Sequence, residues 1–221
     1  MTNSSRLLTI ILTAAAFAAT LAVANPASAQ QFEEGVHFER ISGPDVPDSD
    51  GIVEVVEVFS YMCPACRNFQ PLVGPWHEEL PENVEFSRMP VAFNPSWEPA
   101  ARAYFTAEVL DIVDQSHEAV FVALHDEHKR LQTIDDMAEF HSQFDVDADE
   151  FKSTASSFPV ESRMRMGKAA VGKWQIRATP TLVINGKYRV SPRRGSTYGE
   201  LLQIADMLIE RELEAADPAD S

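Results

Sequence analysis

Two cysteines, Cys63 and Cys66, are the residues whose type and spacing most directly suggest chemistry. They follow the apolar run 52–59 and stand at the start of a helical pattern. At a helix N-terminus, unpaired N–H groups and the helix dipole favour a thiolate. Pro64 suits the first helical position because its missing N–H would have no partner there. We therefore predict a redox dithiol in which the exposed Cys63 attacks and the sheltered Cys66, one turn inside, resolves.

Two other interpretations of the cysteine pair are weaker. A structural zinc site needs two further ligands, and no other cysteine exists. His125 and His128 have the spacing of one helix face, but their neighbours are charged, as on a solvated surface: Asp126, Glu127 and Lys129. A purely structural disulfide would close too short a loop to stabilise the fold much. We expect no metal site, and no cofactor beyond the disulfide itself.

Residues 1–29 have the pattern of a secretory signal. One charge, Arg6, precedes the apolar stretch 7–24, and residues 25–29 read Asn-Pro-Ala-Ser-Ala. This predicts cleavage after Ala29 and a working place in an oxidising compartment, most simply the bacterial periplasm. The competing interpretation is an uncleaved membrane anchor, because the stretch approaches spanning length. The helix-breaking Asn-Pro pair and the small residues at the cleavage site favour removal.

The chain is strongly acidic, with 18 Lys and Arg against 34 Asp and Glu and a formal net charge of −16. The signal holds one of the basic residues and none of the acids, so its removal makes the charge −17. Neither a basic patch nor an interleaved aromatic stripe is visible, which argues against nucleic acid or an anionic membrane as partner. The length of the mature chain suits one globular domain, alone or with an insertion, and we expect a monomer.

Hydrophobic periodicity divides the mature chain into three parts. The first predicts a helix over 63–80, interrupted at Pro71, and strands at 36–41, 52–59 and 84–91. The second predicts helices at 97–113, 116–130, 134–144, 148–157 and 160–174. The third predicts a final helix over 197–215, preceded by a hairpin of strands 181–184 and 187–190 around the turn Asn185-Gly186.

This order of elements predicts an α/β protein with a thioredoxin fold, into which an all-helical domain is inserted at the midpoint. We expect the thioredoxin-like domain to be discontinuous, over residues 30–94 and 172–216. The inserted helical domain would span residues 95–171, and an acidic tail would occupy residues 217–221.

Several stretches of the chain resemble the DsbA family of periplasmic thiol:disulfide oxidoreductases. They are residues 31–35, 59–66, 131–134 and 178–188. The resemblance covers essentially the whole mature chain. It implies that Cys63 is the nucleophile and Cys66 the resolving cysteine, and that the disulfide is donated to newly exported, unfolded proteins. It further implies reoxidation by a quinone-linked membrane oxidase of the DsbB type.

Three positions bear on the redox potential. Ala65 stands where the best-known DsbA proteins have His, and a methyl group cannot stabilise a neighbouring thiolate, so we expect a milder oxidant. Thr179-Pro180 resembles the family's cis-proline loop, which lies against the cysteine pair and exposes backbone to an extended peptide. An ordinary trans proline at the start of a strand is the alternative. Thr179 adds a hydroxyl that could contact a cysteine sulfur.

Glu57 is a carboxylate in a strand whose neighbours are almost all apolar, so it must be paired or hydrated. Arg88, on the next predicted strand, is its natural partner. The resemblance implies an acidic residue beneath the active site at the position of Glu57, and a basic one at that of Arg88. We expect a partly buried pair in which Glu57 helps to move a proton to or from Cys66. The alternative is that both side chains point to solvent.

Two other functions remain open. One is a periplasmic disulfide isomerase or reductase, but known periplasmic isomerases carry an N-terminal dimerisation domain, and only residues 30–62 precede Cys63 in the mature chain. The other is a non-enzymatic, peptide-binding holdase whose dithiol is incidental. The activity of a double Cys63→Ser, Cys66→Ser variant in cells separates the holdase from the enzymes.

Overall fold

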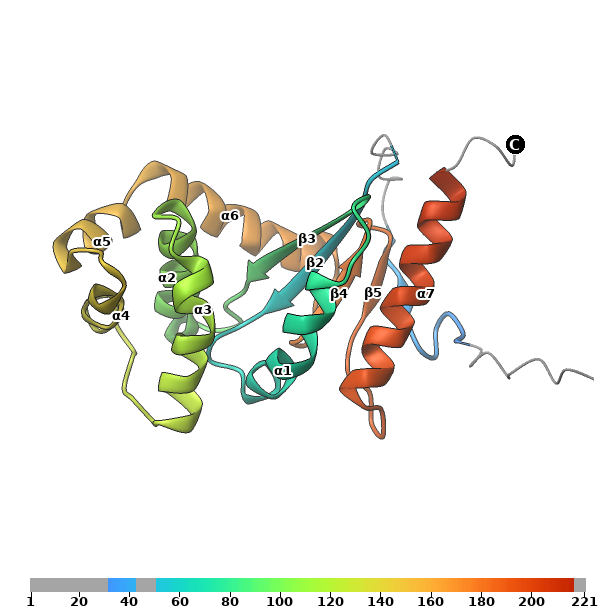
Figure 1. Ribbon diagram of the computed structural model, residues 1–221, viewed down its shortest axis with the longest axis horizontal. Helices are drawn as coiled ribbons and strands as arrows, with labels where there is room; N and C mark the ends of the chain where they lie inside the picture. Colours follow the sequence, from blue (N-terminus) through green and yellow to red (C-terminus); the bar gives the residue numbers. More distant parts are fainter. Residues whose placement is uncertain (1–31, 43–50, 217–221) are drawn as a thin grey trace, which may run out of the picture. The chain divides into compact units, whose positions relative to one another are not determined.

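The computed structural model describes residues 32–42 and 51–216. The predicted signal peptide and the predicted acidic tail lie outside these residues. The described chain contains a mixed sheet with strand order β1-β5-β4-β2-β3 (Figure 1). β2 and β3 are parallel, and the other neighbouring strands are antiparallel. The strands are β1 (Glu39–Arg40), β2 (Val53–Phe59), β3 (Val84–Pro90), β4 (Thr181–Ile184) and β5 (Tyr188–Val190).

Along the chain, helices lie between β2 and β3, between β3 and β4, and after β5. α1 (Pro64–Glu78) connects β2 to β3, and α7 (Tyr198–Ala216) follows β5. The helices between β3 and β4, here called the helical block, are α2 (Glu98–Val109), α3 (Val113–Phe121), α4 (Ile134–His141), α5 (Ala148–Ala155) and α6 (Phe158–Lys173). Shorter turns are η1 (Pro95–Trp97), the π-helical η2 (Val122–Asp126) and η3 (Ser142–Phe144). This is the predicted thioredoxin order with a helical insertion. Within the described residues, no helix is long and apolar enough to span a bilayer.

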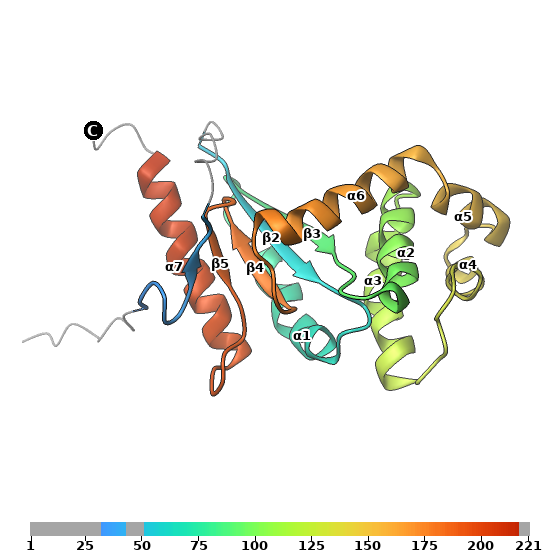
Figure 2. The same ribbon diagram turned by 180° about the vertical axis from the view of Figure 1, so that it is seen from behind.

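The helical block lies beyond the C-terminal ends of β2 and β3 (Figures 1 and 2). A buried cluster joins it to the sheet at this end. Phe59, the last residue of β2, and Tyr61, in the loop after it, pack in this cluster with Tyr104 of α2, Phe121 of α3 and both cysteines. The rings of Phe59 and Tyr61 are arranged edge to face, with their centroids 5.2 Å apart. The dithiol therefore lies where the core of the sheet meets the core of the helical block.

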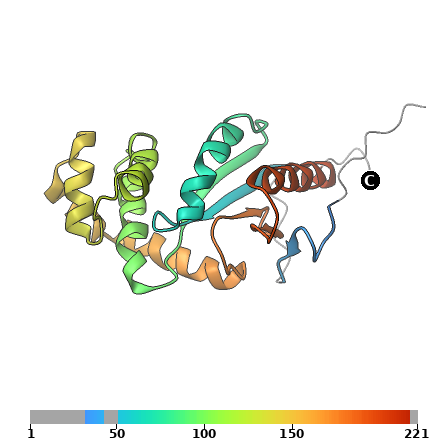
Figure 3. The same ribbon diagram turned by 90° about the horizontal axis from the view of Figure 1, so that it is seen from below.

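The two faces of β2 are both covered by helices. Val53 and Val55 pack in one core with α1 and α7, whereas Val56 and Val58 pack against the end of α6. Figure 3 shows α1 and α6 on opposite sides of the sheet. Because successive side chains of a strand alternate between its faces, Glu57 points to the α1 side. Apart from the exposed Glu54 and the buried Glu57, the strand is apolar on both faces, because helices shield both of them from water.

Three predicted elements differ from the structure. The strand predicted at 36–41 is only two residues long, because its neighbour β5 has just three residues. The helix predicted to break at Pro71 is continuous, since Pro71 and Pro75 lie on its exposed side, where a carbonyl left without its helical partner can be hydrated. The helix predicted over 116–130 starts earlier, in α3, and ends in the π-helical turn η2.

The predicted hairpin turn between β4 and β5 is confirmed. Asn185 and Gly186 have φ angles of 51° and 63°. A type I′ turn needs positive φ at both central positions, which explains why Asn and Gly stand there.

Candidate active site

Cys63 is the N-cap residue of α1, at the end of the loop that follows β2. Its carbonyl accepts hydrogen bonds from the N–H groups of Cys66 and Arg67, at 3.0 and 3.2 Å. Pro64 occupies the start of the helix, as predicted. Both cysteines are free thiols. The structure therefore presents the reduced dithiol on the first turn of α1.

The two cysteines are less accessible than the sequence suggests. Cys63 is 9% exposed and Cys66 is fully buried. Their order agrees with the prediction that Cys63 is the outer sulfur, but Cys63 is not an open surface group. The cause is its position in the aromatic cluster at the end of the sheet, with the loop before β4 at its other side.

Opposite pKa shifts separate the two thiols. The pKa of Cys63 is lowered to about 5, first because the Cys66 thiol donates a hydrogen bond to it, with help from Thr179 and from the N–H groups of Cys66 and Ala65. Burial opposes this shift but does not reverse it. Burial instead raises the pKa of Cys66, and the neighbouring Cys63 raises it further. At neutral pH the outer sulfur is therefore a thiolate, and the inner one keeps its proton.

The peptide bond between Thr179 and Pro180 is cis, as predicted. This loop lies against the dithiol: the Thr179 carbonyl is 3.4 Å from Cys63 Sγ and accepts its hydrogen bond when the thiol is protonated. A hydrogen bond from the Thr179 side chain acts in the other direction and lowers the pKa of Cys63. Ala65, half-buried, contributes only its backbone N–H to the sulfur.

Glu57 and Arg88 form the predicted ion pair. They are directly opposite each other in the parallel ladder of β2 and β3, with Arg88 Nε 3.2 Å from Glu57 Oε2. The side chain of Glu57 is 0% exposed and that of Arg88 14%. Burial raises the pKa of Glu57, while Arg88 and Gln70 act to lower it. The pair is confirmed; a part for Glu57 in proton movement stays a prediction.

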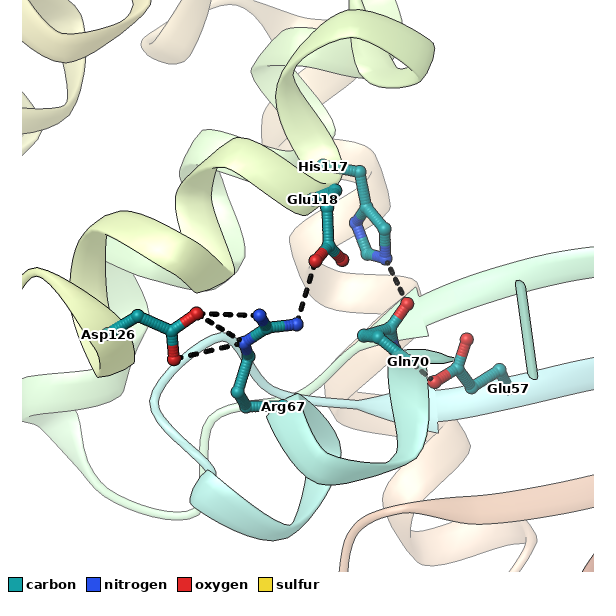
Figure 4. A network of polar contacts seen from close by, with 6 residues as sticks. All are labelled: Glu57, Arg67, Gln70, His117, Glu118 and Asp126. Carbon is teal, nitrogen blue, oxygen red and sulfur yellow. Dashed lines mark hydrogen bonds and ion pairs between the residues drawn. The ribbon is translucent and has the colours of Figure 1, made fainter. Parts of the chain in front are cut away.

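A buried hydrogen-bond chain, which the sequence did not predict, continues from this pair. Figure 4 shows its part from Glu57 through Gln70 to His117. Gln70 Nε2 donates to Glu57 Oε1 at 3.0 Å. Gln70 Oε1 lies 3.1 Å from His117 Nε2, and His117 Nδ1 lies 3.0 Å from the Tyr61 hydroxyl. The chain thus links α1 to α3 and to the loop before the cysteines. Burial holds the pKa of His117 well below its usual value, so the ring is neutral.

One sequence signal could have found His117. It stands on the apolar side of its helix, at helical spacing from Val113, Val120 and Phe121. A single polar residue on such a stripe must find a buried partner. Gln70 carries a weaker signal of the same kind, because it lies one helical turn after Cys66 and next to the buried Phe69.

Arg67 provides a second, outer contact between α1 and the helical block. Its guanidinium binds Glu118 of α3 at 2.7 Å and Asp126 of η2 at 2.6 Å (Figure 4). The side chain of Arg67 is 19% exposed, and both carboxylates face solvent. No sequence pattern indicates this pairing, because it depends on how α3 docks on α1.

The prediction that His125 lies on a solvated surface is wrong. His125 is partly buried and its Nε2 bonds the carbonyl of Tyr61 at 2.7 Å. The π-helical turn η2 carries it, and the wider turn directs the ring toward the active-site loop. His128 is exposed. Among the described residues, no group of three or more His, Cys, Asp or Glu could hold a metal ion.

Comparisons with known proteins agree with this geometry. A family model described as Thioredoxin matches residues 47–203. The thiol:disulfide interchange protein DsbA of Pseudomonas aeruginosa is 38% identical over 190 residues, which are 86% of this chain and 90% of that protein. DsbA of Bordetella parapertussis is 34% identical over 202 residues, 91% of this chain and 95% of that protein.

Solved structures give the same result in three dimensions. The crystal structure of Pseudomonas aeruginosa DsbA matches with a TM-score of 0.78 at 38% identity, covering 84% of this chain and 96% of that one. The oxidoreductase DsbA from Xylella fastidiosa matches with a TM-score of 0.75 at 34% identity, covering 80% and 96%. With its dithiol at a helix N-terminus, its cis-proline loop and its helical insertion, this chain belongs to the DsbA family of thiol:disulfide interchange proteins.

Proposed function

We propose that this protein donates the disulfide between Cys63 and Cys66 to newly exported, unfolded proteins. The observation that carries the proposal is the contrast between the two thiols. A pKa of about 5 for Cys63 stabilises the reduced form, because the thiolate is favoured over the thiol at neutral pH. A protein whose reduced form is stabilised gives up its disulfide readily, and each pKa unit corresponds to about 1.4 kcal/mol of that preference.

The reaction follows the order of the two sulfurs. A substrate thiolate attacks Cys63 Sγ in the oxidised protein, and the bond to Cys66 breaks. Cys66 leaves as a thiolate and takes up a proton, because its buried site disfavours the charged form. A second substrate thiolate then attacks the substrate sulfur of the mixed disulfide and expels Cys63 as its stable thiolate. Two electrons pass from the substrate to the protein.

The loop of Thr179 and Pro180 is the proposed place where substrate binds. It lies against Cys63, and a proline in this position leaves the backbone of the preceding residue free to pair with an extended peptide. Pairing through backbone groups accepts many sequences, as a donor for unfolded proteins requires. We further infer that the mature protein works as a monomer in the periplasm, where a quinone-linked membrane oxidase of the DsbB type reoxidises it.

Trapping experiments test this assignment. The Cys66→Ser variant, treated with a reduced, unfolded protein and a mild oxidant, should accumulate a mixed disulfide at Cys63, while Cys63→Ser should accumulate none. Alkylation of the reduced wild-type protein at pH 6 should label Cys63 far faster than Cys66. Faster labelling of Cys66 would reverse the roles. Retained activity of the double Cys63→Ser, Cys66→Ser variant in cells would instead support the holdase.

The Ala65→His variant tests the proposed redox tuning. An imidazole beside the Cys63 thiolate should stabilise the reduced form and make the protein more oxidising, by about 30 mV for each unit by which the pKa of Cys63 is lowered. Equilibration with glutathione buffers measures this potential, and Ala65→Leu serves as a control of similar bulk without hydrogen-bonding groups. A wild-type potential near that of thioredoxin would favour the reductase instead. An unchanged potential in Ala65→His would show that the helix terminus alone sets it.

A further inference from the structure

The buried chain beyond Glu57 has two possible directions of hydrogen bonding, and they are not equivalent. We propose that Tyr61, at its far end, selects one direction, in which His117 is a positioning residue that turns the N–H of Gln70 toward Glu57 and holds Glu57 as a carboxylate. The carboxylate then accepts the Cys66 proton when the dithiol is reoxidised. This inference rests on the proposed function and names the residues that prepare its proton acceptor.

The observed orientation of Gln70 determines the tautomer of His117. Because Gln70 Nε2 donates to Glu57, its oxygen is the end that faces His117. His117 Nε2 must therefore carry the ring hydrogen and donate it. A neutral imidazole has only one N–H, so Nδ1 is an acceptor. Tyr61 is a buried neutral phenol, and its hydroxyl supplies the hydrogen that Nδ1 accepts.

The reverse direction would leave a group without a partner. If the amide of Gln70 were turned round, its oxygen would face Glu57, which would have to be protonated. His117 would then accept from Gln70 at Nε2 and donate from Nδ1 to the Tyr61 oxygen. The Tyr61 hydrogen would need a different acceptor, and among the described residues the hydroxyl has no hydrogen-bond partner besides His117. A buried donor without a partner is costly, so Tyr61 favours the observed direction.

The chain starts on the helix face that carries the inner sulfur. Gln70, the partner of Glu57, lies one helical turn after Cys66 on the buried side of α1, and this places the Glu57 carboxylate on the side of α1 that Cys66 faces. The charged and titratable groups near Glu57 are few. β3 contributes Arg88, which binds its second oxygen, and Leu182 of β4, its other cross-strand neighbour, is apolar. On α1, α2, α3 and the active-site loop, Cys63 carries the thiolate charge, and the other groups are neutral at pH 7: Cys66, His77, Tyr104, His117 and Tyr61.

The proton step is defined by the second half of reoxidation. An external disulfide first forms a mixed disulfide with the Cys63 thiolate. The Cys66 thiol then gives its proton to the Glu57 carboxylate, attacks Cys63 Sγ and expels the external thiolate. With oxidised glutathione as the probe, the release of glutathione from the Cys63 mixed disulfide reports this step alone, so its pH profile follows the readiness of Glu57 to accept a proton.

The first test is the tautomer of His117, read from the ¹⁵N shifts of its ring at pH 7. We expect the hydrogen on Nε2. A hydrogen on Nδ1 would overturn the proposal. This measurement does not depend on any exchange activity. A protein that shows this tautomer but fails to oxidise substrates would therefore contradict the proposed function, while the inferred direction of the hydrogen bonds would stand.

The second test removes the selecting hydroxyl. In Tyr61→Phe the release of glutathione at pH 7 should slow about fivefold, the equivalent of roughly one net hydrogen bond, and its pH profile should move upward because Glu57 is more often protonated. Tyr104→Phe removes a phenol hydroxyl from a ring that packs against Tyr61 and His117 but takes no part in the hydrogen bonds of the chain, so it should leave both unchanged. Equal profiles in the two variants would overturn the proposal.

A pair of His117 variants guards against a purely structural effect. Gln at this position offers an N–H to Gln70 and an oxygen to Tyr61, so His117→Gln should keep the direction of the chain and a pH profile near wild type. His117→Leu should shift the profile as Tyr61→Phe does. If folded His117→Gln does not keep the wild-type pH profile, the role of the imidazole is not to set the direction of the hydrogen bonds, and the proposal is wrong.

Discussion

Two links join α1 to the helical block, and they use neighbouring residues on both sides. The inner link runs from Gln70 to His117, and the outer link from Arg67 to Glu118 and Asp126 (Figure 4). His117 and Glu118 are adjacent in the sequence, yet one is buried and the other faces solvent. The inner link contains no full charge, and the outer link consists of charges. Their comparison shows how solvent exposure weakens a polar contact and how burial raises the cost of losing one.

Physical chemistry assigns unequal weight to the two links. An ion pair at the surface contributes about 0–1 kcal/mol, and salt screens it. A buried hydrogen bond contributes little more when intact, but removal of one partner leaves the other without water, which costs about 1–3 kcal/mol. The shorter, fully charged contacts of Arg67 are thus the weaker ones. The inner link and the ion pair that continues it should dominate the stability of this region.

The largest effect is expected at the buried end of the inner network. Arg88→Met leaves the Glu57 carboxylate without its cation and should lower the free energy of unfolding by about 3–5 kcal/mol. The double variant Glu57→Gln, Arg88→Met should lose less, because no buried charge remains, while Glu57→Gln alone should slow exchange with a modest effect on the fold. Urea titration at pH 7 measures all three, and simply additive losses would contradict the coupling.

A buried histidine outside both links sharpens the comparison. His141 of α4 donates from Nδ1 to the Met137 carbonyl, but its buried Nε2 has no partner among the residues that the structure describes. Burial lowers its pKa to about 4. The unfolded chain therefore binds a proton near pH 6.5 and the folded chain does not, so stability present above pH 6.5 should fall by about 3 kcal/mol as the pH drops to about 4. His141→Leu should lose this part of the pH dependence, and an unchanged slope would show that the ring is not buried as neutral imidazole.

The direct comparison of the two links uses adjacent residues. His117→Leu removes the partner of both Gln70 and Tyr61 and should lower the free energy of unfolding by about 1–3 kcal/mol. Glu118→Gln, one residue further on, removes a charge of the outer link and should cost less than about 1 kcal/mol. Both can be measured by urea unfolding in one buffer. Equal losses would mean that burial does not distinguish the links.

The smallest effect is expected at the outer link. Asp126→Asn removes the carboxylate that binds Arg67 most closely and should cost about 0.2–1 kcal/mol in low salt. In about 1 M NaCl the difference from wild type should vanish, because the Debye length falls to about 3 Å. His117→Leu is the control, since a loss caused by buried neutral groups should persist in salt. A salt-independent loss in Asp126→Asn would mean that the outer link is effectively buried.

Sequence reasoning succeeded where the signal is local. Cys63, Cys66 and Pro64 occupy consecutive positions with a known helical geometry, and Asn185 with Gly186 specifies a tight turn. Glu57 with Arg88 was predictable because a carboxylate in an apolar strand needs a cation nearby. In each case a few neighbouring residues restrict the structure to one arrangement.

The same reasoning failed where a partner is chosen by docking. Arg67 and His125 acquire their roles from the way α3 and η2 lie on α1, which no local pattern encodes. For His117 the apolar stripe indicates burial but does not identify its partners. His125 was misplaced because its charged neighbours suggested solvent, while the π-helical turn directs it inward. The length of β1 was overestimated for a related reason, since a strand extends only as far as its partner does.

The active site combines contacts that are close along the chain with others that are far apart, and this has a consequence for folding. Thr179, whose side chain helps to lower the pKa of Cys63, is 116 positions from it, and His125, which bonds the Tyr61 carbonyl in the active-site loop, is 64 positions from Tyr61. Contacts of such separation form late, because long loops must close first. A chain that has not yet folded therefore carries two ordinary thiols with pKa values near 8.5. Its reactivity at pH 6 should rise first as α1 forms and again as the contact with Thr179 forms, so the rate of alkylation reports the assembly of the native site.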